Sequence, residues 1–324
     1  MKINELVILS LWLFGFSALT NAEWYPSEYG PEDTLGAANH LSDEKTALAA
    51  RLVKSGKVYS LGVDISSKSP PLPSGPREYN LGLVQPAAGP QGQLSWHAGG
   101  RGITRGANKL SANADFMTIW MGIGTQLEGL AHIGIDNVYY NGAKSEDIVT
   151  PNGVTRYSIH TIPPLVGRGV LLNVAAVKSV DHLPAGYAIS LEDIRAAEKA
   201  SGITVGRGDI VLVHTGWLAA SEAFKAEKPG MQPGLGVAAA KYLASKNVVA
   251  IGADNDAVES IPFEDPTMVF PVHTEMITKR GVYLMENVFT QALADDGANE
   301  FLFVLGQPKF VGAVQAVVNP IAIR

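Results

Sequence analysis

The chain contains no cysteine among its 324 residues. This absence excludes a disulfide framework, a thiolate-ligated metal site and a cysteine nucleophile. A bound metal ion would need histidine, carboxylate or amide ligands. Such ligands favour zinc, manganese or a similar divalent ion over an iron–sulfur cluster.

Basic residues are also scarce, and they form no cluster. Lysine and arginine together number 25, against 31 aspartates and glutamates, which gives a net charge of -6. A nucleic-acid surface would need the opposite balance. We therefore expect a small-molecule partner and no nucleic acid.

Long apolar runs are missing except near the N-terminus. Residues 6–19 are apolar, follow Lys2, and are too few to cross a bilayer comfortably. Residues 20–22 have small side chains and precede Glu23. This pattern predicts a signal peptide over residues 1–22, a periplasmic or secreted mature chain, and no membrane contact after cleavage. The alternatives are an N-terminal membrane anchor and a buried helix.

The 34 glycines and 19 prolines indicate many turns and strands. Strands and helices alternate without an internal repeat, and no linker divides residues 23–324. We therefore predict a single α/β domain with a mixed sheet and flanking helices. Residues 66–106 are expected to form long loops. Strands are expected at 58–65, 116–121, 169–175, 209–214, 248–252, 282–285, 301–305 and 312–318, and helices at 42–54, 190–200, 237–245 and 273–280.

Residues 122–132 hold several reactive side chains in a short space. Gly124 permits a tight turn, and Gln126, Glu128 and His132 follow it. If the chain becomes helical after Glu128, Glu128 and His132 share one face. Such a pair can bind a metal ion or act as base and acid. It can equally be an ordinary ion pair.

A second cluster consists of His273 and Glu286. A helix that packs back on the strand after it would bring the two side chains together. The alternative is that His273 only begins a helix and Glu286 ends a strand in solvent. Asp254 follows a predicted strand, at a position where α/β proteins often place site residues.

Segments spread over most of the mature chain resemble the cyclase family, which includes bacterial kynurenine formamidases and isatin hydrolases. They occur in the family's order. These segments are GPEDTLGAAN (30–39), GTQLEGLAH (124–132), YNG (140–142), GRGVLLNVA (167–175), GDIVLVHTGW (208–217), GADN (252–255) and GVYLMEN (281–287).

The family pattern reads His-x-Gly-Thr-His-x-Asp-x-Pro-x-His, in which the first two histidines and the aspartate bind a divalent metal and the last histidine is an acid/base. In this chain Gly122 replaces the first histidine and Gln126 the second, while Glu128 replaces the aspartate. His132 retains the last histidine. His273 and Glu286 match the family's later metal-site residues.

The resemblance implies a swivelling β/β/α fold and a homo-oligomer, usually a homodimer. It further implies a metal site of Glu128, His273, Glu286 and Gln126, with His132 and Glu128 catalytic. Asp254, Tyr140 and Asn141 are implied to support the site or the substrate. Because glycine offers no ligand and an amide oxygen is a weak one, the site should bind manganese or zinc less tightly than the complete set.

The implied activity is hydrolysis of a carbon–nitrogen amide bond in an aryl formamide or a cyclic amide by a metal-activated water, as an arylformamidase of tryptophan catabolism does. Two alternatives stay open because of the missing ligands. One is an exported, metal-free protein that only binds a small molecule. The other is a metal-free acid/base enzyme that uses Glu128 and His132.

Overall fold

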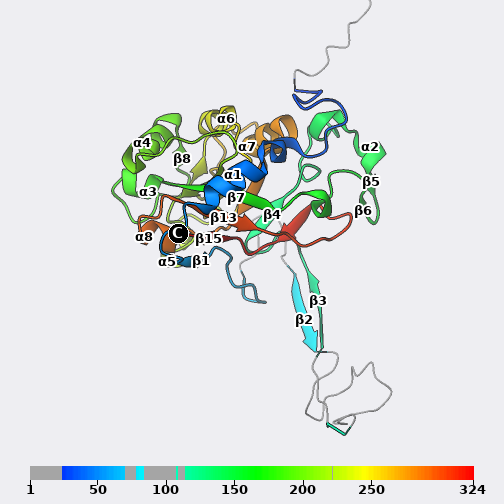
Figure 1. The fold of residues 1–324 in the computed structure, drawn as a ribbon, viewed down its shortest axis with the longest axis horizontal. Helices are drawn as coiled ribbons and strands as arrows, with labels where there is room; N and C mark the ends of the chain where they lie inside the picture. Colours follow the sequence, from blue (N-terminus) through cyan, green and yellow to red (C-terminus); the bar gives the residue numbers. More distant parts are fainter. Residues whose placement is uncertain (1–23, 70–77, 84–106, 109–113, 221) are drawn as a thin grey trace, which may run out of the picture.

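The computed structural model describes residues 24–69, 78–83, 107–108, 114–220 and 222–324. The predicted signal peptide over residues 1–22 and most of the predicted loop region lie outside the described residues. One large mixed sheet forms the centre of the molecule, and helices flank it (Figure 1). The predicted α/β class with a mixed sheet is confirmed.

The sheet has nine strands, in the spatial order β1-β15-β13-β7-β9-β11-β12-β4-β14. The run from β7 to β12 is parallel, and the pairings on either side of it are antiparallel. The strands are β1 (Val58–Ser60), β15 (Ile321–Ile323), β13 (Glu300–Leu305), β7 (Leu165–Asn173), β9 (Ile210–His214), β11 (Ala250–Ala253), β12 (Tyr283–Glu286), β4 (Gln126–Glu128) and β14 (Gln315–Val317).

The described residues also form three two-stranded pairs. These are β2 (Tyr79–Leu83) with β3 (Asp115–Ile119), β5 (Val149–Thr150) with β6 (Gly153–Val154), and β8 (Ala188–Ile189) with β10 (Gly234–Leu235). The helices are α1 (Asp43–Ala50), α2 (Ser145–Ile148), α3 (Val174–Val177), α4 (Leu191–Ser201), α5 (Glu222–Ala226), α6 (Val237–Ser245), α7 (Pro271–His273), α8 (Gln291–Asp295), the 3-10 helices η1 (Gly36–His40), η2 (Tyr140–Gly142) and η3 (Ile159–Thr161), and the π-helix η4 (Thr274–Lys279).

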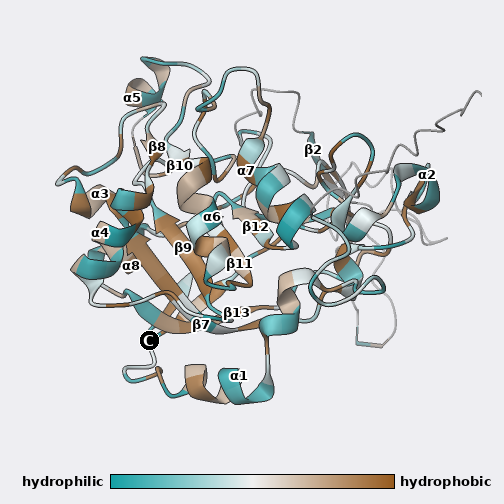
Figure 2. Cartoon of the chain, turned by 90° about the horizontal axis from the view of Figure 1, so that it is seen from above, coloured by the Kyte–Doolittle hydropathy of each residue, from teal (hydrophilic) through white to brown (hydrophobic). Residues whose placement is uncertain are grey.

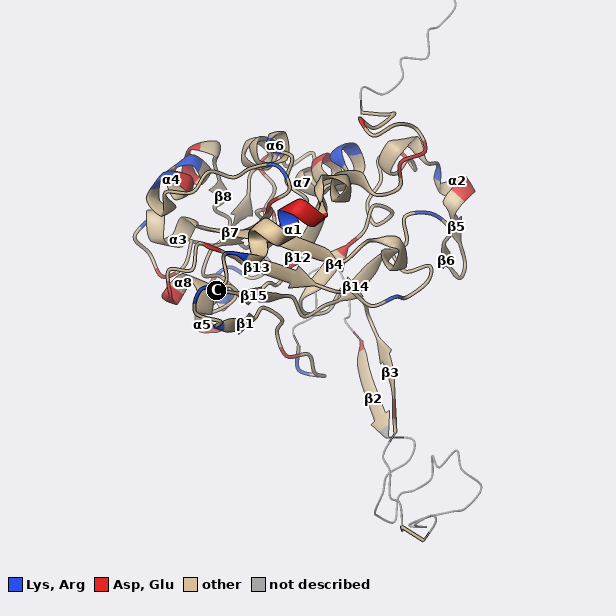
Figure 3. Ribbon diagram, viewed as in Figure 1, with Lys and Arg blue, Asp and Glu red and all other residues tan. Residues whose placement is uncertain are grey.

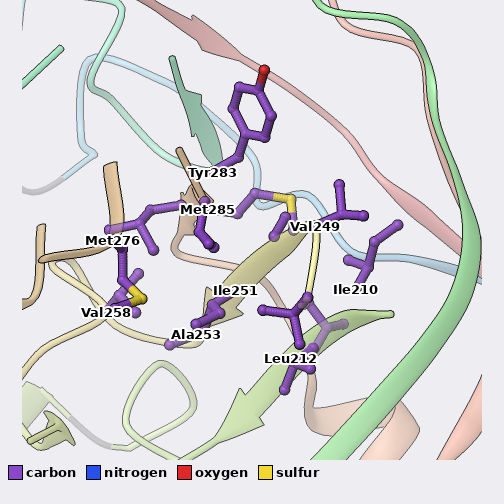
Figure 4. Packing of buried hydrophobic residues seen from close by; sticks show 14 of the residues in the cluster. Ile210, Leu212, Val249, Ile251, Ala253, Val258, Met276, Tyr283 and Met285 are labelled. Atoms are coloured by element: carbon purple, nitrogen blue, oxygen red, sulfur yellow. The ribbon is translucent and has the colours of Figure 1, made fainter. Parts of the chain in front are cut away.

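The parallel strands are mostly apolar because both of their faces are covered, and their polar residues include Arg168 of β7, His214 at the end of β9 and Glu286 at the end of β12. Every residue of β9 and β11 is buried. Side chains of β9, β11 and β12, among them Leu212, Ile251 and Met285, pack together with Met276 of η4 (Figure 4). Figure 2 shows these apolar strands at the centre of the molecule, and Figure 3 shows the charged residues mainly on helices and connecting segments. The core therefore fixes the ends of β11 and β12.

Several predicted elements differ from the observed ones. The strand expected at 58–65 ends at Ser60, and the helix expected at 42–54 ends at Ala50. The loop region contains β2, which pairs with β3. The helix expected at 273–280 is the short α7 followed by a π-helix, and the strand expected at 312–318 shortens to β14, with β15 after it. The ends of these elements depend on pairing between segments far apart in the sequence. Local residue propensity does not reveal that pairing.

β2 and β3 form an arm that extends away from the body (Figure 1). Leu81 and Met117 are direct partners across the two strands, so their side chains share one face, and both are exposed. Immediately after β3, Trp120 returns the chain to the body. The arm therefore begins next to residues 122–132, which hold Gln126, Glu128 and His132.

No helix among the described residues is long and apolar enough to cross a membrane.

Candidate active site

Residues 126–128 form strand β4, and the residues after Glu128 form a turn, not the helix that would place Glu128 and His132 on one face. β4 lies between β12 and β14, so Gln126 is the direct partner of Glu286, and Glu128 is the direct partner of Gln315. Because alternate residues of a strand face the same side, Gln126 and Glu128 point together and Leu127 points into the core. The sheet register thus gathers two carboxylates and two amides.

His273 reaches the same point from α7. Its Nε2 atom lies 3.3 Å from Oε2 of Glu128 and 3.5 Å from Oε1 of Glu286. Its Nδ1 atom contacts Oε1 of Glu259 at 2.5 Å. Glu259 also accepts hydrogen bonds from the backbone N–H groups of Val272 and His273, each at 3.1 Å. Glu259 therefore holds the backbone at the start of α7 and the imidazole ring of His273. Its position leaves Nε2 of His273 directed at Glu128 and Glu286.

Glu128, His273 and Glu286 fit a divalent metal ion. One ligand atom from each lies within 4.8 Å of the others, and all three residues are buried. Metal–ligand bonds of about 2.0–2.2 Å would separate adjacent ligand atoms by roughly 3–3.6 Å, which matches the two histidine–carboxylate distances. Oε2 of Glu128 is buried and makes no hydrogen bond, so it is available to an ion. A hydrogen-bonded carboxylate behind the histidine is the usual support of a metal-bound imidazole.

The charges at this point favour a cation. Burial alone would lower the pKa of His273, but Glu128 and the other carboxylates raise it well above its usual value. Burial raises the pKa of Glu286, and the charge of Glu128 raises it further. Burial opposes the charge of Glu128, yet His132 and His273 outweigh burial and lower its pKa. The carboxylates therefore hold protons or a cation between them.

His132 lies at the edge of this cluster. Its Nε2 atom is 3.4 Å from Oε1 of Glu128 and 3.3 Å from the amide nitrogen of Gln315. Because that amide nitrogen donates, Nε2 of His132 accepts and carries no proton. Burial lowers the pKa of His132, and the charge of Glu128 opposes that shift. Its side chain is 23% exposed, which leaves it open to a bound molecule.

Gln126 presents its nitrogen, not its oxygen, to the carboxylates. Nε2 donates to Oε2 of Glu286 at 2.6 Å and to Oε1 of Glu128 at 3.2 Å. The metal-ligand role predicted for Gln126 would therefore require the amide to turn over. Its Oε1 atom is buried without a hydrogen bond.

Gly122 stands where the resemblance places the first histidine of the family pattern, and neighbouring side chains crowd the position of a side chain there. A Cβ atom built there would lie 2.9 Å from Nε1 of Trp120 and 3.2 Å from Oε1 of Gln126. An indole and an amide oxygen therefore border the position of the missing ligand.

A cavity of about 270 Å³ opens at the site. Its polar wall consists of Gln126, Glu128, His132, Asp256, His273, Glu286 and Gln315, and its apolar wall consists of Trp120, Ile133, Ala257, Ile261 and Phe270. Such a cavity suits a small molecule with one apolar ring and one polar group.

Three predicted residues lie elsewhere. Asp254 accepts hydrogen bonds from Thr215 and from the backbone N–H of Gly216, and so fixes a turn. Tyr140 donates to Asp33 at 2.7 Å. Asn141 bonds to the backbone of residues 27–33. None of the three lines the cavity, and the latter two fasten the N-terminal segment.

The sequence argument missed Glu259, Gln315 and Trp120. Trp120 was signalled only by its place before Gly122. Gln315 lies in a predicted strand, but its partner strand was not foreseen. Glu259 gave no local signal, because its contact with His273 spans 14 residues of irregular chain.

Comparison with known proteins agrees with this geometry. The family model Cyclase, described as "Putative cyclase", matches residues 59–260. The chain belongs to the cyclase family. No curated protein matches it.

Solved structures share the cyclase-family fold. The crystal structure of a novel cyclase is 27% identical, with a TM-score of 0.75, and the match covers 91% of this chain and 98% of that one. Isatin hydrolase A from Ralstonia solanacearum is 18% identical, with a TM-score of 0.60 and coverage of 86% and 96%. Isatin hydrolase A from Labrenzia aggregata, bound to benzyl benzoate, is 15% identical, with a TM-score of 0.58 and the same coverage.

Proposed function

We propose that this protein is a metal-dependent hydrolase of a carbon–nitrogen amide bond in a small molecule, such as an aryl formamide or a cyclic amide. The observation that carries the proposal is the buried Glu128–His273–Glu286 cluster at one end of the cavity. Membership of the cyclase family and the fold shared with isatin hydrolases support it.

In this proposal, one set of residues holds an ion and a separate histidine moves a proton. Glu128, His273 and Glu286 would hold manganese or zinc, and Glu259 would keep Nε2 of His273 turned toward the ion. When bound, such an ion polarises a carbonyl oxygen and lowers the pKa of a water molecule. His132, whose pKa is lowered by burial, would take the proton of the attacking water at Nε2, the atom that contacts the amide nitrogen of Gln315. It then returns that proton to the departing nitrogen.

The apolar wall orients the substrate. Trp120 and Phe270 lie on the same cavity as the carboxylates, so a planar ring packed against them places an attached carbonyl beside the ligand cluster. Bringing the reacting groups together in this way supplies much of the rate enhancement of an enzyme.

The first test is the metal content of the protein comprising residues 23–324, measured by plasma mass spectrometry before and after incubation with manganese or zinc. We expect about one ion per chain, and we expect His273→Ala to lose it. His160→Ala is the matched control, because His160 bonds to Ser158 and does not line the cavity. Absence of an ion in the wild type, or its retention in His273→Ala, would overturn the metal mechanism.

His132→Ala tests the proton transfer. We expect the variant to keep its ion and to lose about 10²- to 10⁴-fold in kcat toward formanilide, since general acid–base catalysis contributes about that factor. Turnover that resists chelation of the metal but fails in His132→Ala would instead establish the metal-free acid/base enzyme. Ligand binding without turnover in the wild type would establish a binding protein.

A further inference from the structure

A second cavity, of about 610 Å³, lies apart from the candidate active site. It is bordered by the N-terminal residues 24–40, by helix α6 and by the end of η4, which gather along one side of the molecule (Figure 1). The two cavities share no lining residue. A cavity of this volume holds a small organic molecule, and the proposed hydrolysis uses none of its side chains.

Three basic side chains line this second cavity, although the chain as a whole carries a net charge of -6. They are Lys241 of α6, Lys279 at the end of η4 and Arg280 beside it, here called the basic cluster. The carboxylates on the cavity are those of Glu28 and Glu275. Positive side chains therefore outnumber negative ones, and a cavity with an excess of one charge concentrates ligands of the opposite charge.

Glu275 holds the basic cluster together without using all of its donors. Its side chain is buried, and its Oε1 atom lies 2.9 Å from Nε of Arg280. Its Oε2 atom lies 3.1 Å from Nζ of Lys279 and 3.9 Å from Nζ of Lys241, and the second distance is too long for a hydrogen bond. Within the described part of the chain, the terminal amino groups of Arg280 bond to no acceptor. Donors therefore stay available on cations that a buried carboxylate already positions, and such preorganisation lowers the cost of binding.

Positive charge also reaches the other end of this cavity, where the hydroxyl of Tyr29 and Nε2 of His40 lie 2.6 Å apart. Burial lowers the pKa of His40, and the charges of Arg207 and Lys45 lower it further against the opposing charge of Glu28. The positive potential is therefore not confined to the basic cluster.

We propose that this second cavity binds a small organic anion. The oxygens of its carboxylate or phosphate group accept hydrogen bonds from the basic cluster, and its apolar body packs against Trp24 and Tyr29. A guanidinium group binds either kind of anion through two parallel hydrogen bonds. A phosphate monoester carries nearly two negative charges, so it matches the excess of positive charge better than a carboxylate does.

The test uses three probes that share a phenyl ring: phenyl phosphate, benzoate and the neutral benzyl alcohol. Each is titrated by isothermal calorimetry into the protein comprising residues 23–324, first after dialysis against a chelator and then after loading with manganese. We expect both anions to bind at least about tenfold more tightly than the alcohol, because hydrogen bonds to charged groups are the stronger ones. We expect phenyl phosphate to bind the more tightly, with the same affinity in both preparations.

Variants then assign the binding to the basic cluster. Lys241→Gln and Arg280→Gln should each weaken the binding of phenyl phosphate by about 10- to 100-fold. Lys241 makes the longest contact with Glu275, so its variant serves should Arg280→Gln not fold. The matched control is Lys199→Gln, which removes one exposed positive charge from the last turn of α4, away from the cavity. It should leave the affinity unchanged.

The outcomes separate this site from the candidate metal centre. Equal binding of the three probes, binding of none, binding that requires manganese, or binding that survives in both variants would overturn the proposal. Tighter binding of benzoate would keep the site and assign it to carboxylates. The site needs neither an ion nor turnover, so a protein that binds no metal and hydrolyses nothing can still confirm it.

Discussion

Glu259 is the side chain on which the orientation of His273 depends. It accepts hydrogen bonds from the ring and from two backbone N–H groups of the turn, while it is itself buried. Loss of such a partner behind a metal-bound histidine costs about 10- to 100-fold in metal affinity. We expect Glu259→Gln to weaken manganese or zinc binding by that factor, measured by competition with a chromophoric chelator.

The control for this prediction is Glu275→Gln. Glu275 is also buried, follows His273 by two residues, and pairs with Lys279 and Arg280 instead of with the ring. An equal loss of affinity in both variants would show that the helix had loosened, and would refute a specific role for Glu259.

Gly122 and Gln126 make a second prediction at the residue scale. A side chain at 122 would have to displace the exposed indole of Trp120, and a second substitution at 126 removes the amide of Gln126 from the same place. Replacing both positions in Gly122→His/Gln126→His should restore the two imidazole ligands of the family pattern and tighten metal binding at least about tenfold. The affinity is read by the same chelator competition, with Gln126→His as the intermediate. No gain in the double variant would show that β4 does not direct these positions at the ion.

Single residues were predictable where a chemical pattern supported them. The structure brings Glu128, His132, His273 and Glu286 together at one cavity. Asp254 illustrates the opposite case, because a carboxylate after a buried strand serves equally well to bind the N–H groups of a neighbouring turn. One sequence does not distinguish these two uses, since the deciding partner lies 39 positions away.

At the scale of elements, α4 begins with a complete capping box. Ser190 accepts from the backbone of Asp193, and Asp193 accepts from the backbone of Ser190. Burial alone would raise the pKa of Asp193, but Lys178 and these hydrogen bonds lower it below its usual value. Asp193 therefore stabilises the fold above its unfolded-state pKa, and this contribution disappears as the pH falls through the lowered folded value.

We expect Asp193→Asn to reduce the free energy of unfolding by about 0.5–2 kcal/mol at pH 7. The difference from the wild type should stay constant down to about pH 5 and shrink as the pH falls further. Urea unfolding at a series of pH values measures it. Glu192→Gln is the control, because Glu192 is exposed in the same turn. A difference that grows on acidification would contradict the prediction.

Elements were predictable where local signals agree with packing. The capped helix α4 and the apolar helix α6 occur where the sequence places them. The three residues of β4 were not recognised as a strand, because two of them are polar and yet buried. Hydrophobic alternation identifies a strand by its apolar face, so it fails where the polar face is the interior one.

At the scale of the whole molecule, metal binding should stabilise the fold. The ligands come from β4, α7 and β12, so an ion joins distant parts of the chain. An ion present at 100 times its Kd adds about 2.7 kcal/mol, which for a protein of this size raises Tm by roughly 4 °C. Calorimetric scans with and without a chelator test this. A shift of equal size in His273→Ala would contradict our ligand assignment.

The overall class followed from the sequence, but the order of the strands did not. The parallel run from β7 to β12 consists of apolar segments in chain order. The insertion of β4 between β12 and β14 depends on pairings across about 160–190 positions, and no local pattern encodes such pairings.

Because β4 lies between β12 and β14, the candidate active site can assemble only late in the synthesis of the chain. β4 is among the early strands of the sequence, yet both of its neighbours, β12 and β14, are made near the end. Until Glu286 has been synthesised, Glu128 has neither its partner carboxylate nor a strand beside it. An unfinished chain would therefore hold no assembled metal site, and an ion could enter only a molecule whose folding is nearly complete.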